Sequence, residues 1–269
     1  MVKIPYVTTN GIKLYYEIHG EGHPLVMIMG LSANLDWWNP EFLNAMTEKF
    51  KVITFDNRDA GRSEKSKEVY MIKIFAEDTI GLIDELGIEK AHFLGVSMGG
   101  MIAQEIALNF PERVNKLVLC STNCGNPKSK LPSQEVLKVL TQERDDITSE
   151  QIIEETIPLL FTDEFRETNQ ELVEQTKFNM LKAPIEPSAY RRQINAILKF
   201  NSGRRLKKLK IPTLIIHGKK DILIPPENAE ILSNLIPNSN VQLFEKSAHG
   251  IFMHEPKKVI KAVLEFLEH

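Results

Sequence analysis

The sequence predicts an α/β protein in which helices cover both faces of a mostly parallel sheet. Short apolar runs of strand length alternate with amphipathic segments of helical length up to residue 122, and again from residue 211. Between these parts, residues 123–210 show helical periodicity and no run typical of a strand. We therefore expect one α/β core made of residues 1–122 and 211–269, with an all-helical lid inserted at 123–210.

Composition restricts the class of protein and its partners. The 269 residues are 42% hydrophobic and 26% charged, which is typical of a globular protein with a sizeable core. The net charge of −3 and the absence of a basic tract argue against nucleic acid and anionic membranes as partners. Residues 1–9 alternate in polarity and do not form the apolar stretch of a signal peptide, and the run 25–29 is too short to cross a bilayer.

The two cysteines, Cys120 and Cys124, make neither a disulfide framework nor a good zinc site, because no histidines cluster near them. We expect reduced thiols and a cytoplasmic protein. The sequence leaves the oligomeric state open between a monomer and a homodimer.

The first part of the core begins with a hairpin. Residues 3–8 and 12–19 are predicted strands, joined at Thr9-Asn10-Gly11 because Asn-Gly favours a tight turn. The elements expected after it are a strand at 25–29, a helix at 42–50, a strand at 52–55, a helix at 72–86, a strand at 91–94, a helix that Pro111 ends, and a strand at 116–120.

The lid and the second part of the core follow. Four helices are expected in the lid, at 133–144, 149–161, 163–181 and 187–200, with prolines that interrupt or bound them. The α/β pattern then resumes with a strand at 212–217, a helix at 226–235, a strand at 241–244 and a final helix from His254.

A candidate nucleophile lies between the strand at 91–94 and the helix after it. Gly95, Ser97 and Gly99 have the G-x-S-x-G spacing of a nucleophile elbow. A serine on such a sharp strand-to-helix turn needs glycine neighbours, since side chains there would crowd the backbone. An ordinary glycine-rich turn would match the same pattern, but the strand before it and the helix after it favour a reactive serine at the positive end of a helix dipole.

An activated serine needs a base and a third group that orients the base. Catalytic groups in open α/β sheets gather after the carboxyl ends of strands, and His249 follows the last predicted strand. We expect His217, inside the end of a strand, to be a hydrogen-bonded core residue. Asp221 directly follows a strand, whereas its rival Asp56 precedes the serine and has Arg58 in the same turn as a natural structural partner.

The chain order Ser97, Asp221, His249 is that of the α/β-hydrolases, and the sequence resembles this family along nearly its whole length. The residues that carry the resemblance are Gly95-Val96-Ser97-Met98-Gly99-Gly100, Gly218-Lys219-Lys220-Asp221, Ala248-His249, Glu255-Pro256 and the turn Phe55–Ser63. The resemblance implies a Ser97–His249–Asp221 triad and an oxyanion hole formed by the backbone N–H groups of Leu31 and Met98. No metal or organic cofactor is implied.

Three departures from the family pattern accompany the resemblance. Asp59 and Ala248 stand where glycine is usual, and Met29-Gly30-Leu31 replaces a turn that begins His-Gly. The last change leaves the expected oxyanion donor in place, because the donor is a backbone N–H group.

The resemblance also narrows the reaction. Serine at the nucleophile position argues against epoxide and haloalkane hydrolysis, for which relatives carry aspartate. The turns at 30–38 and 56–63 are most similar to those of small carboxylesterases and methylesterases, so a small-molecule ester is the expected substrate. Enol-lactonases, perhydrolases or haloperoxidases, and a non-catalytic ligand-binding relative remain alternatives. Six residues could line an apolar pocket under the lid, or equally be plain core: Trp37, Trp38, Phe161, Met180, Leu223 and Ile251.

Overall fold

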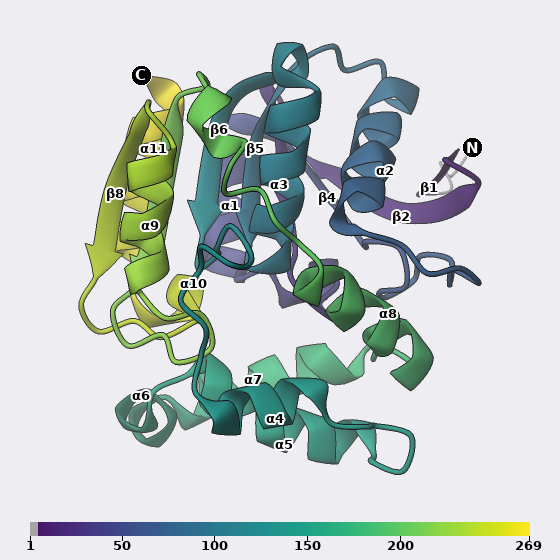
Figure 1. Cartoon of the computed structure of the whole chain (residues 1–269), viewed down its shortest axis with the longest axis vertical. Coiled ribbons are helices and arrows are strands. Elements are labelled where there is room, and N and C mark those ends of the chain that lie inside the picture. The colour runs from purple at the N-terminus through teal and green to yellow at the C-terminus, as the bar shows by residue number, and fades with distance from the viewer. Residues whose placement is uncertain (1–4) are drawn as a thin grey trace.

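A single eight-stranded sheet runs through the core of the computed structural model, which describes residues 5–269 (Figure 1). Its strands lie in the order β1-β2-β4-β3-β5-β6-β7-β8. β1–β2 and β2–β4 are antiparallel pairs, and the remaining pairs are parallel. The strands are β1 Tyr6–Thr9, β2 Ile12–His19, β3 His23–Ile28, β4 Phe50–Phe55, β5 Ala91–Val96, β6 Val114–Cys120, β7 Thr213–Gly218 and β8 Ser239–Phe244. The mostly parallel sheet predicted from the sequence is confirmed.

Helices cover both faces of this sheet. α2 (Ile72–Glu85), α3 (Met98–Asn109) and α9 (Glu227–Leu235) pack on one face, and α1 (Pro40–Thr47) and α11 (Pro256–Glu268) pack on the other. In β3, Val26 and Ile28 belong to the first apolar cluster, while Leu25 and Met27 belong to the second. Successive side chains of a strand point to opposite faces, so a strand covered on both sides reads as an unbroken apolar run.

Five α-helices lie between β6 and β7 and form a separate layer beside the sheet (Figure 1). They are α4 Gln134–Thr141, α5 Ser149–Leu160, α6 Asp163–Thr168, α7 Gln170–Leu181 and α8 Pro187–Leu198. The predicted helix 163–181 is divided, because Asn169 leaves helical geometry (φ −129°, ψ 43°) and serves as the last cap of α6 and the first cap of α7. We call residues 123–210 the helical insert; its limits stay a prediction.

Several predicted boundaries in the core also differ. The helix predicted at 42–50 begins earlier, at Pro40, because the Asn39 side chain caps it by accepting a 2.9 Å hydrogen bond from Phe42 N–H. It ends at Thr47, and Phe50 already belongs to β4. The final helix predicted from His254 instead begins at Pro256 as α11, because proline has no N–H group and suits the first position of a helix. His254 is the last residue of a short preceding helix, α10 (Ile251–His254). Residues 3 and 4 of the first predicted strand lie outside the described residues.

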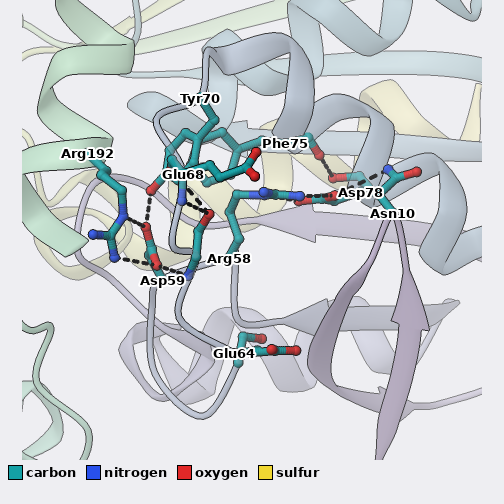
Figure 2. A network of polar contacts seen from close by, with 12 residues as sticks. Asn10, Arg58, Asp59, Glu64, Glu68, Tyr70, Phe75, Asp78 and Arg192 are labelled. Atoms are coloured by element: carbon teal, nitrogen blue, oxygen red, sulfur yellow. Dashed lines mark hydrogen bonds and ion pairs between the residues drawn. The ribbon is translucent and has the colours of Figure 1, made fainter.

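The helical insert is fastened to the core through Asp59, the residue that stands in place of glycine (Figure 2). Asp59 adopts a left-handed backbone (φ 71°), and its carboxylate is fully buried. Arg192 of α8 donates to it through Nε and Nη2, over 2.7 and 2.9 Å. The hydroxyl of Tyr70 and the N–H group of Ser66 complete its set of donors. The carboxylate therefore joins the turn after β4 to the insert.

Arg58, in the same turn, pairs with Asp78 of α2 through two hydrogen bonds of 2.5 and 2.6 Å (Figure 2). The prediction that Arg58 is the partner of Asp56 is therefore wrong. Asp56 is bound by other donors, which are described with the site below. Sequence proximity suggested the wrong partner because the Arg58 side chain turns away from its own loop toward α2.

The two neighbouring arginines of α8 provide a test of this attachment. Arg192→Met should lower the free energy of unfolding by about 2–4 kcal/mol, because it leaves the buried Asp59 carboxylate without its counter-ion. Arg191→Met is the matched control: its partner Asp145 is exposed, so the loss should stay under about 1 kcal/mol. Urea denaturation of both variants measures the difference. Equal losses would show that the buried pair does not hold the insert.

Candidate active site

Ser97 occupies a strained turn between β5, which ends at Val96, and α3, which begins at Met98. Its backbone lies at φ 55° and ψ −118°, a conformation that residues other than glycine rarely adopt. The surroundings hold it there. Ser97 N–H donates to Cys120 O over 2.9 Å, and the Thr122 hydroxyl donates to Ser97 O over 2.7 Å. The side chain of Ser97 therefore has a fixed starting direction, as a nucleophile elbow requires.

The glycines around Ser97 are required by close backbone contacts. A Cβ atom on Gly95 would lie 2.2 Å from the carbonyl oxygen of Gly99, and one on Gly99 would lie 2.1 Å from that of Ile28. On Gly100 it would meet the side chain of Thr122 at 2.6 Å. Backbone cannot yield at these distances, so the prediction that only glycine suits both flanking positions agrees with the geometry.

His249 and Asp221 lie in the loops after β8 and β7. His249 Nδ1 lies 2.8 Å from Asp221 Oδ2, and the carboxylate can only accept, so Nδ1 carries the proton. The other oxygen, Oδ1, accepts hydrogen bonds from the N–H groups of Leu223 and Ile224 over 2.9 and 2.8 Å. His217 is fully buried, with Nε2 2.8 Å from Ile224 O and 3.3 Å from Asp221 Oδ2. It is the hydrogen-bonded core histidine that the sequence predicts.

The electrostatics of this pair keep Asp221 charged. Burial acts to raise the pKa of Asp221, but the positive charge of His249 and the hydrogen bonds from His217 and His249 outweigh it. The pKa of Asp221 falls to about 2. The carboxylate is therefore ionised at any pH near neutrality and can stabilise a protonated imidazole at position 249.

Ser97 and His249 line one cavity of about 180 Å³. In the described part of the chain the Ser97 hydroxyl makes no hydrogen bond to the imidazole; catalytic contacts of this kind often tighten only when substrate binds. Asp221 stands behind His249 and is 3% exposed. The structure thus brings the three predicted residues to one place, with the serine and the imidazole on the cavity wall.

The turn Met29-Gly30-Leu31 passes directly beside Ser97. A Cβ atom on Gly30 would lie 3.1 Å from Ser97 Cβ and 3.7 Å from Ser97 Oγ. Leu31 and Ser97 line the same cavity. Among the hydrogen bonds of residues 5–269, the backbone N–H groups of Leu31 and Met98 have no acceptor. Both donors predicted for an oxyanion hole are thus left unused by the fold.

The turn after Leu31 is held in place by the helical insert. Ser32 has a left-handed backbone (φ 62°), and its N–H group donates to Gln193 Oε1 of α8 over 2.9 Å. Gln193 is fully buried, and its Nε2 donates to Arg58 O over 3.0 Å. Asn34 donates from its side chain to Ala183 O over 3.0 Å. Nothing in the sequence pattern distinguishes Gln193 from the other polar residues of α8, so sequence analysis did not find it.

Asp56 fixes the same turn from the opposite side. Its two carboxylate oxygens accept hydrogen bonds from the N–H groups of Leu35 and Arg62 over 2.8 and 2.7 Å. Burial raises the pKa of Asp56, although these hydrogen bonds oppose the change. Next to it, the Asn57 side chain donates to Met29 O over 3.0 Å. Asp56 is thus bound to the turn before α1 and to its own loop, while His249 is bound to Asp221.

The cavity wall is mostly apolar and includes four of the six predicted residues: Trp37, Trp38, Phe161 and Leu223. Met180 borders a small adjoining cavity of about 30 Å³. Ile251 is fully buried in the core cluster under α11 and borders neither cavity. The insert adds Arg144, Thr156, Thr176 and Tyr190, which the sequence analysis missed because their spacing is that of ordinary helix residues.

Other kinds of site receive no support from the described residues. No group of three or more His, Cys, Asp or Glu side chains among residues 5–269 could hold a metal ion. Cys120 and Cys124 are free and buried, and burial raises the pKa of both thiols. In the same range, no helix combines the length and the apolar character that crossing a membrane requires.

Known proteins match this arrangement over nearly the whole chain. A protein of Caulobacter sp. (strain K31) named "Putative carbamate hydrolase RutD" is 26% identical over 260 residues, covering 94% of this chain and 95% of the relative. A thermophilic esterase from Thermogutta terrifontis is 28% identical, with a TM-score of 0.84, covering 99% of this chain and 97% of the esterase. The enol-lactonase from Burkholderia xenovorans LB400 is 24% identical, with a TM-score of 0.89 and coverage of 98% and 100%.

The family model of the alpha/beta hydrolase fold matches residues 23–256, which contain β3 to α10 and every residue of the candidate site. Together with the elbow at Ser97 and the strand order of the sheet, this match shows that the chain is a hydrolase belonging to the α/β-hydrolase fold family.

Proposed function

We propose that the protein cleaves carboxylic esters of small molecules through Ser97, His249 and Asp221, with an acyl-enzyme intermediate. One observation carries the proposal: a serine on a strained elbow and an imidazole bound to a buried carboxylate line the same apolar cavity. The 28% identity to the Thermogutta terrifontis esterase supports an ester as substrate.

The chemistry follows from the positions of these groups. His249 Nε2 takes the proton of Ser97 Oγ as the oxygen attacks the ester carbonyl. The N–H groups of Leu31 and Met98 bind the oxyanion, beside the elbow. The protonated imidazole then gives its proton to the leaving alcohol, and the acyl group stays on Ser97. A water molecule, deprotonated by His249, then attacks the acyl-enzyme, and a second oxyanion forms in the same place. His249 returns the proton to Ser97 Oγ as the bond to the acyl group breaks, which releases the acid and restores the serine.

Carbamates form the second candidate substrate class. Several relatives that align over at least 94% of this chain, with 25–27% identity, carry the name "Putative carbamate hydrolase RutD". A carbamate presents a carbonyl that the same serine could attack.

Enol-lactones and perhydrolysis would also use this acyl-enzyme. A lactone keeps its leaving oxygen attached to the acyl group, and in perhydrolysis peroxide replaces water. A non-catalytic ligand-binding role is disfavoured, because the serine, the imidazole and the carboxylate that the chemistry needs are all present at one site.

We also propose that the helical insert acts as a lid that selects the substrate. Its residues Leu159, Phe161 and Tyr190 line the cavity. It also touches the histidine loop, since Gly250 N–H donates to Leu160 O over 2.8 Å. Binding energy from such a wall acts on the position of the substrate and on the exclusion of water.

Ser97→Ala should fold normally and lose kcat by on the order of 10⁴-fold or more, because the nucleophile is gone. Stopped assays with a series of p-nitrophenyl esters, methyl esters, lactones and carbamates measure the activity. A fluorophosphonate should label the wild-type protein at Ser97 and leave the variant unlabelled. Persistent labelling of the variant would mean that another residue is the nucleophile.

Two buried aspartates can be compared directly. Asp221→Asn should lower kcat by on the order of 10³- to 10⁴-fold, because the amide cannot stabilise the imidazolium and favours the wrong tautomer. Asp56→Asn should instead lower the free energy of unfolding by about 1–3 kcal/mol, because one backbone N–H group loses its acceptor. Kinetics and thermal melting of both variants separate these effects. The reverse pattern would make Asp56 the catalytic carboxylate.

Phe161 and Phe165 test the role of the insert, because their rings stack but only Phe161 lines the cavity. Phe161→Leu should move the preference for acyl length by about 1–3 kcal/mol in relative kcat/KM toward bulkier esters. Phe165→Leu, the matched control, should lower stability and leave the preference unchanged. If both variants lose all esters equally and react slowly with a small phosphonate, the insert belongs to the catalytic scaffold.

A further inference from the structure

Arg144 is a charged residue in the wall of an otherwise apolar cavity. It lies in the turn between α4 and α5 and lines the same cavity as Ser97 and His249. It also borders the small adjoining cavity of about 30 Å³, together with Trp37. Only 6% of the residue is exposed. The guanidinium group is thus buried beside the space in which the substrate is proposed to bind.

Arg144 has no counter-ion among the described residues. No carboxylate lies within ion-pair distance of it, and its Nε has no hydrogen-bond acceptor. Glu155 is the acidic residue that acts on its charge, but this side chain is exposed and bound to Gln142. Burial lowers the pKa of Arg144, although Tyr190 and Glu155 oppose the change. Seven other arginines each have a carboxylate partner: Arg58, Arg62, Arg113, Arg166, Arg191, Arg192 and Arg205.

The contact that Arg144 does make is too weak to balance its burial. Its Cζ lies 3.5 Å from the centre of the Tyr190 ring. Such a cation–π contact stabilises a charge far less than burial without an anion destabilises it. A second donor near it is also unpaired: Nε1 of Trp37 is buried and has no hydrogen-bond acceptor. Both residues border the same small cavity.

Three hydroxyl groups of the wall are already bound to backbone carbonyls. The hydroxyls of Thr156, Thr176 and Tyr190 donate to Ile152 O, Leu172 O and Leu140 O, over 2.7, 2.8 and 2.9 Å. Arg144 is the one lysine or arginine among the described residues that line the cavity. One negative charge would balance it, and a doubly charged phosphate would retain an uncompensated charge. A planar carboxylate matches the guanidinium fork with two parallel hydrogen bonds.

We propose that the substrate carries a single carboxylate group in addition to the bond that Ser97 attacks, and that Arg144 binds this carboxylate. The inference rests on the proposed function, because it concerns the substrate of the same site. The substrate class is therefore a half ester, or a related acyl compound, whose apolar chain separates a reactive carbonyl from one carboxylate. Trp37 Nε1 supplies a further donor to the same oxygen atoms.

Monoethyl esters of linear dicarboxylic acids, from succinate to suberate, test this preference. Each is compared with the neutral ethyl ester of the same length that ends in a methyl group. The wild-type protein should hydrolyse at least one half ester with a kcat/KM roughly 10-fold or more above that of its neutral counterpart. Arg144→Met should reduce this ratio by roughly 10- to 100-fold, mainly through KM, and Arg144→Lys should restore part of it.

Arg191→Met is the control for a general charge effect, since it removes one positive charge from the exposed side of the insert. It should leave the ratio unchanged. Thermal melting and the rate of fluorophosphonate inactivation show whether each variant is folded with a reactive serine. Equal hydrolysis of charged and neutral esters at every length would overturn the inference, and so would an equal loss of both in Arg144→Met.

Failure of the proposed function would look different. In that case no ester is cleaved and no phosphonate labels Ser97. The carboxylate site is then tested by binding alone: calorimetric titration of hexanoate into the wild-type protein should show binding that Arg144→Met weakens by roughly 10-fold or more. Equal binding to both proteins, or none to either, would overturn the inference irrespective of catalysis.

Discussion

The close approach of three backbone segments at Ser97 is the constraint on which the rest of the structure depends. Gly95 meets Gly99, and Gly99 meets the end of β3, at distances that exclude any side chain. These contacts require β3 and β5 to be neighbours and α3 to start immediately after the serine. The same contacts therefore set the order of the strands, the direction of α3 and the position of the Ser97 hydroxyl on the cavity wall. The energetic cost of the left-handed backbone at Ser97 is met by packing on both faces of the sheet.

The helical insert is part of this arrangement and does more than cover the cavity. Arg192 and Gln193, adjacent in α8, reach two different loops of the core: one binds the carboxylate of Asp59, and the other binds the N–H group of Ser32. Gln193 thereby holds the turn that presents Leu31 beside Ser97. Asp59 in place of glycine gives α8 an anion to bind, at the expense of an aspartate in left-handed geometry. The same helix, α8, therefore contributes to the cavity wall and holds the turn beside Ser97.

Two buried charged groups near the cavity, Asp221 and Arg144, differ in whether the fold supplies partners for their charge. Asp221 is buried but receives four hydrogen-bond donors, so its charge is stabilised and its pKa lies at about 2. Arg144 is nearly as buried and receives only an aromatic ring. A low dielectric constant strengthens the hydrogen bonds of the paired carboxylate and raises the energetic cost of the unpaired guanidinium. The carboxylate that we propose for the substrate would supply the anion that Arg144 lacks.

Local chemistry in the sequence determined the sheet class, the elbow around Ser97, and the loops that contain Asp221 and His249, because each depends on neighbours within a few residues and on the ends of strands. The catalytic roles of these residues stay a prediction. Only the tertiary structure decided the partners of Arg58, which pairs with Asp78 and leaves Asp56 to backbone donors. It alone showed that a helix break at Asn169 divides the insert, that Gln193 binds the N–H group of Ser32, and that Arg144 is unpaired. Such features depend on which distant side chains meet in space, and a helix residue carries no local mark of what lies opposite it.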